Sequence, residues 1–239
     1  METPLPIETD YPEEIFRPDL APEYRAGCAK AYFKTNFLAR RLFRKRVDIA
    51  FGLMPSGPCD RALDAGTGAG FLLPGLAARC HEVVGVDLAP VLHYTKGMLD
   101  KRGLDNVKLA EADLLHLPYD GPTFDLAVCL SVIEHIPEPE TALKELARVL
   151  HHDAVLILGY PIENAFFVVL KWMTRIEKRS RLLIQGKPLP RGKALRPHVT
   201  DCRRLEISVE KIFKIEACRD IRIAGSPVYR ILKLRKNNG

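Results

Sequence analysis

The sequence predicts a single α/β domain built around a mostly parallel β-sheet. Three observations support this prediction. Segments with the pattern of strands alternate with segments that have the pattern of helices through the middle of the chain. Some strands, such as Ala154 to Leu158, are uninterrupted apolar runs, which is typical of strands covered on both faces. A chain of 239 residues suits one sizeable core, and the alternation favours right-handed βαβ units.

Residues 1–57 are expected to form an N-terminal arm and one helix. Residues 1–23 are rich in proline and acidic side chains and have no clear period, so we expect an irregular arm. A helix is expected from about Asn36 to Leu53, with basic side chains covering its polar face. Its apolar face would comprise Leu38, Leu42, Ile49 and Leu53. Pro55 and Pro58 then break the chain.

Residues 58–161 hold the regular alternation and are expected to form the cofactor-binding core. Strands are expected at 61–65, 83–87, 107–110, 124–130 and 154–158. A helix should follow the first strand and reach about Arg79, with Pro74 in its first turn. Further helices are expected from Pro90 to Lys101 and, with a clear amphipathic period, from Pro139 to Leu150.

The pattern changes after Pro161. Residues 162–200 are expected to form a lid or substrate-binding insertion, with a helix from Asn164 to about Arg181 and a proline-rich loop at 185–200. Residues 201–239 would add a helix at 202–210 and two strands, 212–223 and 228–234, joined near Gly225. We expect all these parts to form one domain spanning 1–239.

The composition indicates an intracellular, cytoplasmic protein. No segment reaches the length of apolar residues that a membrane-spanning helix needs, and the N-terminus lacks the apolar core of a secretory signal. None of the six cysteines lies in a CxxC pair, so the spacing of a metal site is absent and reduced, mostly buried thiols are expected.

The net charge of +6 is concentrated in two segments. Residues 25–46 contain eight Lys or Arg and no acid, and residues 171–196 contain nine with the single acid Glu177. Two interpretations stay open. The segments are either solvated helix faces or a basic rim for an acidic substrate, an anionic membrane surface or nucleic acid.

The most informative stretch is the glycine-rich loop from Leu63 to Gly70, between a predicted strand and a predicted helix. Its glycines are spaced G-x-G-x-G, so it matches neither the dinucleotide fingerprint nor a phosphate loop. Asp64 inside the motif disfavours phosphate and suits a cationic ligand, such as a sulfonium with an α-ammonium group. Asp87 ends the next strand, 21 residues after Gly66, where an acid accepts hydrogen bonds from ribose hydroxyls.

The stretch Asp64–Gly70 resembles the first motif of class I S-adenosylmethionine-dependent methyltransferases. Segments 86–88, 111–114 and 124–131 resemble the later motifs in order, and 131–136 with 142–159 is similar to the small-molecule branch called type 11, which includes ubiquinone and menaquinone methyltransferases. The resemblance covers roughly 58–161. It implies a doubly wound, Rossmann-like sheet of seven strands with helices on both faces. It also implies S-adenosyl-L-methionine as cofactor, bound by Asp64, Ala65, Gly66, Thr67, Gly68, Gly70, Asp87, Leu88, Asp113, Leu114 and Leu130. His151, His152 and Asp153 replace the lysine–proline–glycine turn usual in similar proteins, which leaves the local loop shape open.

His135 is the candidate general base, since it follows the fourth strand, near where the methyl group would be presented. The alternative is a histidine that caps a helix start and packs under the cofactor. Glu134 is a candidate for orienting substrate or binding cofactor. Some relatives in quinone synthesis bind a metal with a Glu-x-x-Glu-His cluster here, but Ser131 occupies the first position, so no metal is predicted.

The acceptor is expected to be a small molecule that is acidic or lipid-like. Trp172 in the insertion and His198 after its proline-rich loop are candidate substrate contacts. A basic amphipathic helix with aromatic residues within 164–196 would also suit peripheral contact with an anionic membrane. An RNA methyltransferase and a non-catalytic methyltransferase-like binding protein remain as alternatives. The sequence does not indicate the oligomeric state.

Overall fold

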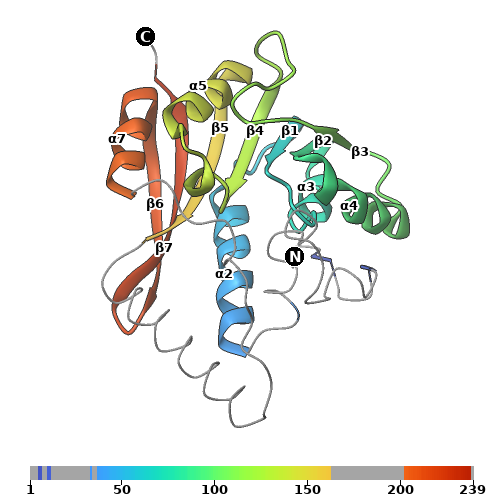
Figure 1. The fold of residues 1–239 in the computed structure, drawn as a ribbon, viewed down its shortest axis with the longest axis horizontal. Coiled ribbons are helices and arrows are strands. Elements are labelled where there is room, and N and C mark those ends of the chain that lie inside the picture. Colours follow the sequence, from blue (N-terminus) through green and yellow to red (C-terminus); the bar gives the residue numbers. More distant parts are fainter. Residues whose placement is uncertain (1–4, 7–9, 12–32, 34–36, 163–201, 238–239) are drawn as a thin grey trace.

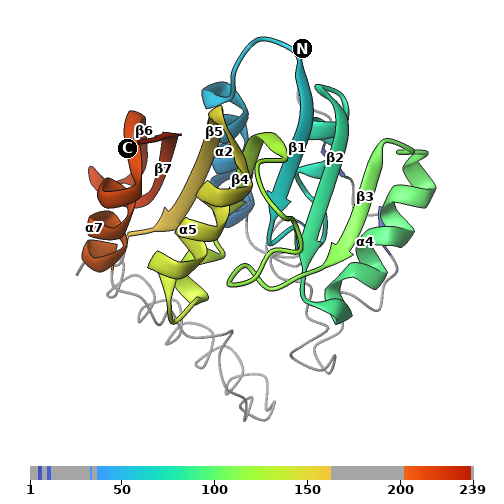
Figure 2. The same cartoon turned by 90° about the horizontal axis from the view of Figure 1, so that it is seen from above.

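A seven-stranded sheet forms the centre of the protein (Figure 1). The structure is a computed structural model that describes residues 5–6, 10–11, 33, 37–162 and 202–237. The sheet order is β3-β2-β1-β4-β5-β7-β6, and β7 alone runs in the direction opposite to that of the other six strands. The strands are β1 (Cys59–Ala65), β2 (Cys80–Asp87), β3 (Val107–Glu111), β4 (Phe124–Leu130), β5 (Leu150–Pro161), β6 (Phe213–Ile223) and β7 (Ser226–Lys236). Figure 2 shows the five parallel strands side by side, with β6 and β7 beyond β5.

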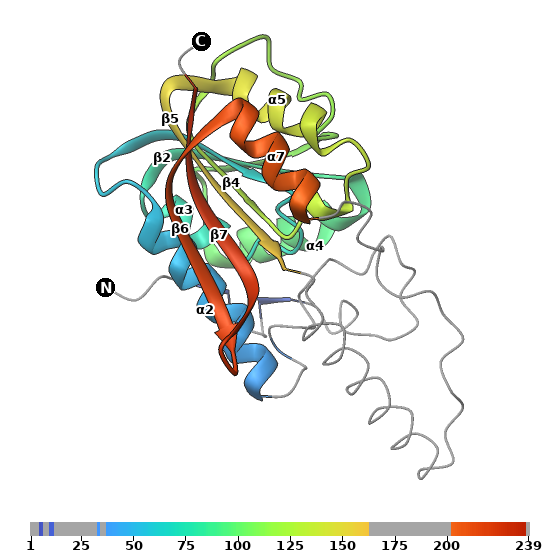
Figure 3. The same ribbon diagram turned by 90° about the vertical axis from the view of Figure 1, so that its left-hand side faces the viewer.

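Helices cover both faces of the sheet (Figure 3). They are α2 (Phe37–Leu53), α3 (Leu73–Ala77), α4 (Ala89–Arg102), α5 (Pro139–Val149) and α7 (Cys202–Ile212). Residues of α2, α3 and α4 share one core cluster with strand residues such as Ala62 and Val128. Residues of α5 and α7 share a second cluster with the alternate strand residues, such as Leu63 and Cys129. The predicted fold class, a doubly wound and mostly parallel sheet, is confirmed.

The physical reason for this arrangement lies in the apolar strands. Successive side chains of a strand point to opposite faces, so an unbroken apolar run needs cover on both sides. In β5 the residues from Ala154 to Tyr160 are all buried, with Val155 and Ile157 in one cluster and Leu156 and Leu158 in the other. The helices supply that cover. The amphipathic pattern of the helices agrees with this packing most clearly in α5, where Leu143 and Leu146 are fully buried.

Element boundaries differ from the expected ones mainly at strand starts. β1 and β2 begin two to three residues early, at Cys59 and Cys80, and pair there in parallel register. The segment His151–Asp153 is not a separate loop. It is the exposed first part of β5, where the pairing of β4 with β5 shifts register between Phe124 and Leu126. The missing lysine–proline–glycine turn is therefore replaced by a longer, irregularly paired strand.

The expected apolar face of α2 does pack against the core, but it is not the most deeply buried face of the helix. The side chains that face the core are Arg46, Val47, Ala50 and Phe51, whereas Leu42, Ile49 and Leu53 are only partly buried at the margin. The side chain of Leu38 lies outside the described residues. The correction follows from packing: α2 contacts β5, β6 and β7, and the position of those strands cannot be read from the local periodicity. One basic residue therefore lies on the buried face and not in solvent.

The expected helix 164–181 and the loop 185–200 lie outside the described residues. Among the helices that the structure describes, none is long and apolar enough to cross a membrane. The five described cysteines are free, with Cys80 and Cys129 buried and Cys59 and Cys202 half-buried. Cys218 is exposed, so the expectation of mostly buried thiols fails for that residue because it lies on β6 at the sheet edge.

Candidate functional site

The carboxyl ends of the parallel strands gather the residues that the sequence singled out. In an open α/β sheet this edge is the usual place for a ligand. Here β1 ends at Ala65 and continues into the glycine loop, β2 ends at Asp87, and Ser131 follows β4. The loop is held to the sheet by the backbone N–H groups of Gly66 and Thr67, which both donate to the Val86 carbonyl at 2.8 and 2.9 Å.

Gly66 is required by both its conformation and its surroundings. Its φ of +79° lies in the left-handed region that side chains with a Cβ avoid. A Cβ at this position would lie 2.3 Å from Val132 Cγ2, in the segment that follows β4. The glycine therefore lets the loop after β1 lie directly against the loop after β4. This contact joins the two halves of the site.

Gly68 has a different role, because the space above it is open. Its φ is +53°, and a Cβ there would meet no atom of the described residues within 4 Å. Its N–H donates to Asp87 Oδ2 at 2.7 Å, while the N–H of Leu88 donates to Asp87 Oδ1 at 2.8 Å. The two bonds fix the orientation of the Asp87 carboxylate, one through each of its oxygens. The loop thus fixes the Asp87 carboxylate beside an unfilled space.

Asp64 is a buried acid directly beneath the glycine loop. Only 2% of its surface is exposed, and Thr67 Oγ1 donates to its Oδ2 at 2.6 Å. Burial raises the pKa of the Asp64 carboxyl to about 7, against the lowering effect of the Thr67 hydrogen bond, and the negative charge of Asp87 adds to the rise. A cation placed near this carboxyl would favour its ionised form.

The remaining residues expected at the cofactor lie along the same edge, in different environments. Asp113 Oδ1 accepts from the N–H of Leu115 at 3.0 Å just after β3. Leu88 is exposed and Leu130 half-buried. Ala65 and Leu114, in contrast, have their side chains buried in the core cluster under α5 and α7. Any contact that these two make with a ligand has to come from their backbone.

The segment after β4 carries the candidate catalytic residues. Ser131 has a φ of +60°, which is unusual for a residue with a side chain, and its N–H donates to the Gly159 carbonyl at 2.8 Å. A short 3₁₀ helix (Ile133–His135) follows. Glu134 is buried, and its Oε1 lies 4.0 Å from His135 Nε2, whose side chain is 26% exposed. His135 therefore reaches the surface with a buried carboxyl beside it.

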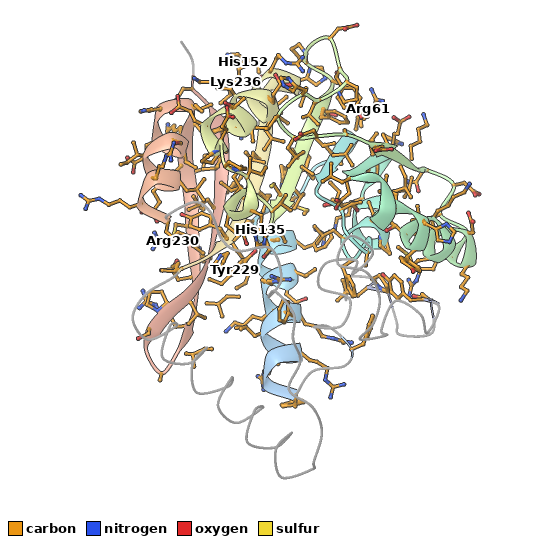
Figure 4. All side chains as sticks on the ribbon, in the orientation of Figure 1. Arg61, His135, His152, Tyr229, Arg230 and Lys236 are labelled. Atoms are coloured by element: carbon orange, nitrogen blue, oxygen red, sulfur yellow. The ribbon has the colours of Figure 1, made fainter. Side chains whose placement is uncertain are left out.

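Three residues that the sequence did not single out as a group meet beside this segment. Arg46 of α2 donates from Nη1 to Ser131 Oγ at 2.7 Å, and Ser131 Oγ lies 2.8 Å from the Tyr229 hydroxyl of β7. Figure 4 shows Tyr229 and His135 at the same end of the sheet, while Arg61 and His152 lie at the opposite end. The only local signal for Arg46 is its position three residues after Phe43 and four before Ala50, on one face of the helix.

Aromatic residues of the N-terminal part cover the outside of the glycine loop. The Tyr11 hydroxyl donates to the Ala69 carbonyl at 2.6 Å, and its ring stacks on Phe71 with 5.8 Å between centroids. Phe33 packs against both rings. The hydrogen bond and the ring contacts tie the end of the glycine loop to the N-terminal part of the chain.

Comparison with known proteins identifies the core. Residues 63–158 match the family model described as "Methyltransferase domain". This segment is a methyltransferase domain. The methyltransferase class expected from the sequence is confirmed for these residues.

Curated relatives of the methyltransferase domain include enzymes of quinone synthesis. The demethylmenaquinone methyltransferase of Thermus thermophilus is 38% identical over 122 residues, which are 49% of this chain and 53% of that protein. The rice chloroplastic 2-methyl-6-phytyl-1,4-hydroquinone methyltransferase 2 is 32% identical over 117 residues, which are 48% of this chain and 32% of that protein. The chain thus spans between a third and about half of the length of these relatives.

The fold also matches a solved methyltransferase. Magnesium protoporphyrin IX methyltransferase from Synechocystis PCC 6803, solved with bound SAH, superposes with a TM-score of 0.66 at 20% identity. The match covers 94% of this chain and 98% of that protein, so the shared fold extends beyond the residues of the family model. At this identity the likeness concerns the fold.

The residues of the methyltransferase domain fit its cofactor. The Asp87 carboxylate, held by the Gly68 N–H beside the side of that glycine that no described residue fills, is a group of the kind that accepts hydrogen bonds from a ribose diol. The buried Asp64 carboxyl lies at the other end of the loop, where a positively charged methionine end would offset the cost of its ionisation. Trp172 and His198, the expected substrate contacts, lie outside the described residues.

We expect Gly66→Ala to destabilise the methyltransferase domain more than Gly68→Ala. The left-handed φ alone costs about 1–2 kcal/mol at either position, but only at Gly66 does a Cβ also collide with Val132. Urea unfolding of both variants measures the difference in free energy of unfolding. Gly66→Ala combined with Val132→Ala should recover part of the loss, with Val132→Ala as the reference. Equal losses for the two glycine variants would contradict the proposed contact.

The buried Asp64 carboxyl should make stability depend on pH. Between about pH 4 and pH 7 this group is protonated in the native protein and ionised in the unfolded chain, so its contribution to stability is lost as pH rises through this window. Asp64→Asn lacks this loss. The free energy of unfolding of Asp64→Asn, taken relative to that of the wild type, should therefore rise by a few kcal/mol between about pH 4 and pH 7.

The control for this titration is Asp105→Asn, because Asp105 is exposed. Its unfolding curves should run parallel to those of the wild type at every pH. Parallel curves for Asp64→Asn as well would show that the carboxyl is already ionised in the native protein.

Proposed function

We propose that this chain is an S-adenosylmethionine-dependent methyltransferase that acts on a small acidic or lipid-like acceptor. The observation that carries the proposal is the pair of carboxyl groups at the glycine loop: Asp64 buried beneath it and Asp87 held beside the open space over Gly68. A phosphate-binding loop would not place two acids there. This pair suits a ligand with a hydroxylated ribose at one end and a cation at the other.

Bound S-adenosylmethionine would supply a methyl group on a sulfonium, whose departure leaves a neutral thioether. The work left to the protein is then to position the acceptor and to exclude water. Asp87 would hold the ribose hydroxyls, Asp64 would stabilise the cationic end, and Asp113 would lie near the adenine. The tight contact between Gly66 and Val132 sets the distance from these groups to the residues after β4.

His135 is proposed as the group that takes the acceptor's proton. Its side chain is partly exposed on the short helix after β4, and the Glu134 carboxyl, with Oε1 4.0 Å from Nε2, would stabilise a protonated imidazole. A hydroxyl or an ammonium acceptor needs such a base, and a positioned base contributes roughly 10²–10⁴-fold in rate. The alternative, a histidine that only packs, predicts no such effect.

The acceptor class is inferred from the relatives and from the charge pattern. The two relatives described above are named as methyltransferases of demethylmenaquinone and of 2-methyl-6-phytyl-1,4-hydroquinone, which are lipid-like molecules. The basic segments 25–46 and 171–196 would suit an acidic acceptor or an anionic membrane surface. A cytoplasmic protein that contacts the membrane peripherally through 164–196 is part of this proposal.

Asp87→Ala should weaken binding of S-adenosylhomocysteine by at least about tenfold, because it removes both the ribose acceptor and the partner of the Gly68 N–H. Calorimetric titration measures the dissociation constant, and circular dichroism confirms that the variant is folded. Asp105→Ala, which removes an exposed aspartate, serves as the matched control and should bind like the wild type. Failure of the folded wild type to bind would overturn the proposed function.

His135→Gln should lower kcat by roughly 10²-fold or more while leaving S-adenosylhomocysteine binding unchanged. The assay follows transfer of labelled methyl from S-adenosylmethionine to demethylated quinols and to aromatic acids. His152→Gln is the control, because His152 is exposed at the opposite end of the sheet. Transfer only in the presence of added RNA would favour an RNA methyltransferase. Tight cofactor binding without transfer to any acceptor would favour a non-catalytic protein.

A further inference from the structure

Cys59 and Cys80 are the first residues of the neighbouring strands β1 and β2. The two strands run parallel, and their register places Cys59 directly opposite Cys80. Neighbouring strands lie about 4.8 Å apart, which is within the range of about 4.4–6.8 Å between Cα atoms that a disulfide bond needs. The backbone thus holds the two cysteines at a separation at which they can be joined.

The side chains of the two cysteines face the same side of the sheet. Cys80 belongs to the core cluster shared with α2, α3 and α4, and Cys59 packs against this cluster. A hydrogen bond joins the two side chains, with the Cys59 thiol donating to the Cys80 sulfur. Both cysteines are free of a disulfide bond in the structure. They therefore form a reduced pair whose sulfur atoms are in contact.

The hydrogen bond makes the two thiols unequal. It lowers the pKa of the Cys80 thiol, and the positive charge of Arg79 acts in the same direction, whereas burial and the negative charge of Asp125 oppose this effect. The same hydrogen bond, together with burial, raises the pKa of the Cys59 thiol. Because the thiolate is the reactive form of cysteine, the hydrogen bond favours oxidation of the pair at Cys80.

The pair is open to small reagents and lies away from the candidate cofactor site. Cys59 is half-buried, while Cys80 is 6% exposed. Both residues lie at the amino ends of their strands, whereas the glycine loop and Asp87 lie at the carboxyl ends. Arg61, two residues after Cys59, is at the end of the sheet opposite His135 (Figure 4). A reagent therefore reaches the pair without entering the cofactor site.

A bond between these two residues would enclose the cofactor loop. Residues 59–80 comprise β1, the whole glycine loop and α3. A disulfide at their ends closes this segment into a covalent ring, which restricts the unfolded chain and so stabilises the folded protein. Because the native register already places the two ends together, the ring closes without a change in strand pairing.

We propose that Cys59 and Cys80 form a site of reversible oxidation, at which hydrogen peroxide converts the two thiols into a disulfide between β1 and β2. A thiolate of the pair attacks one peroxide oxygen, the O–O bond breaks and hydroxide leaves, so that this sulfur becomes a sulfenic acid. The sulfur of the other cysteine then displaces the hydroxyl group as a second hydroxide and forms the S–S bond. Each hydroxide takes up one thiol proton. Two thiols and one peroxide thus give a disulfide and two water molecules, and the two electrons lost by the sulfurs reduce the peroxide. The site acts independently of methyl transfer.

The test treats the full chain with a small excess of hydrogen peroxide, caps the remaining thiols with an alkylating agent under denaturing conditions, and measures the intact mass. The wild type should have two fewer thiols to cap, and peptide mapping should find Cys59 joined to Cys80. Dithiothreitol should restore both thiols. Cys218→Ser, which removes an exposed cysteine of β6, is the control and should form the same disulfide.

Cys59→Ser and Cys80→Ser should each abolish this disulfide. In Cys59→Ser the oxidised Cys80 has no partner, so it should remain a sulfenic acid that dimedone captures. The half-buried position of Cys59 keeps the test decisive even if Cys80→Ser, at a buried position, fails to fold. Oxidation should also raise the melting temperature of the wild type by roughly 5 °C or more and leave that of Cys59→Ser without this rise.

Three results would overturn the proposal. In the first, both thiols of the folded wild type survive the peroxide. In the second, Cys59 or Cys80 gains oxygen while no bond forms between them. In the third, either cysteine is found joined to a different cysteine in the wild type and in Cys218→Ser alike. None of these results depends on cofactor binding, so they leave the proposed function untouched.

Discussion

The contact between Gly66 and Val132 is the constraint on which the site depends. It presses the loop after β1 against the segment after β4, at the two central strands of the sheet. The proposed function assigns the cofactor to the loop after β1 and the acceptor to the segment after β4. The backbone of one segment lies against the side chain of the other, so a displacement of either would disturb this contact. The carboxyl groups of Asp64 and Asp87 and the imidazole of His135 thereby keep a fixed relation without any direct bond between them.

Much of the fold and the cofactor half of the site could be predicted from the sequence. The glycine loop, Asp64 and Asp87 are local features, since they lie within one strand–loop–helix–strand unit and their spacing alone indicates their placement. The same holds for β4 and α5, whose apolar patterns reflect burial on both faces or on one stripe. In these segments the local sequence pattern and the tertiary packing favour the same types of residue at the same positions.

The acceptor half could not be predicted in the same way. Arg46, Ser131 and Tyr229 lie far apart in the sequence: the hydrogen-bonded residues Ser131 and Tyr229 are separated by 98 positions. Each of the three is unremarkable within its own segment. The most deeply buried face of α2 differs from the expected one because the strands it packs against determine its rotation, and those strands come much later in the chain. The exposed start of β5 depends similarly on a register shift between two strands. Nonlocal pairing, not residue preference, decides these features.

The β6–β7 hairpin protects the protein from association through its own sheet. The inner strand β5 is buried from Ala154 to Tyr160, and it would present an unpaired edge there if β7 were absent. β7 pairs with that edge in the antiparallel direction, and β6 then becomes the outermost strand. β6 exposes charged side chains at Lys214, Arg219 and Arg222, which disfavour the addition of a further strand. The hairpin that brings Tyr229 to the site thus also gives the sheet an edge that resists aggregation.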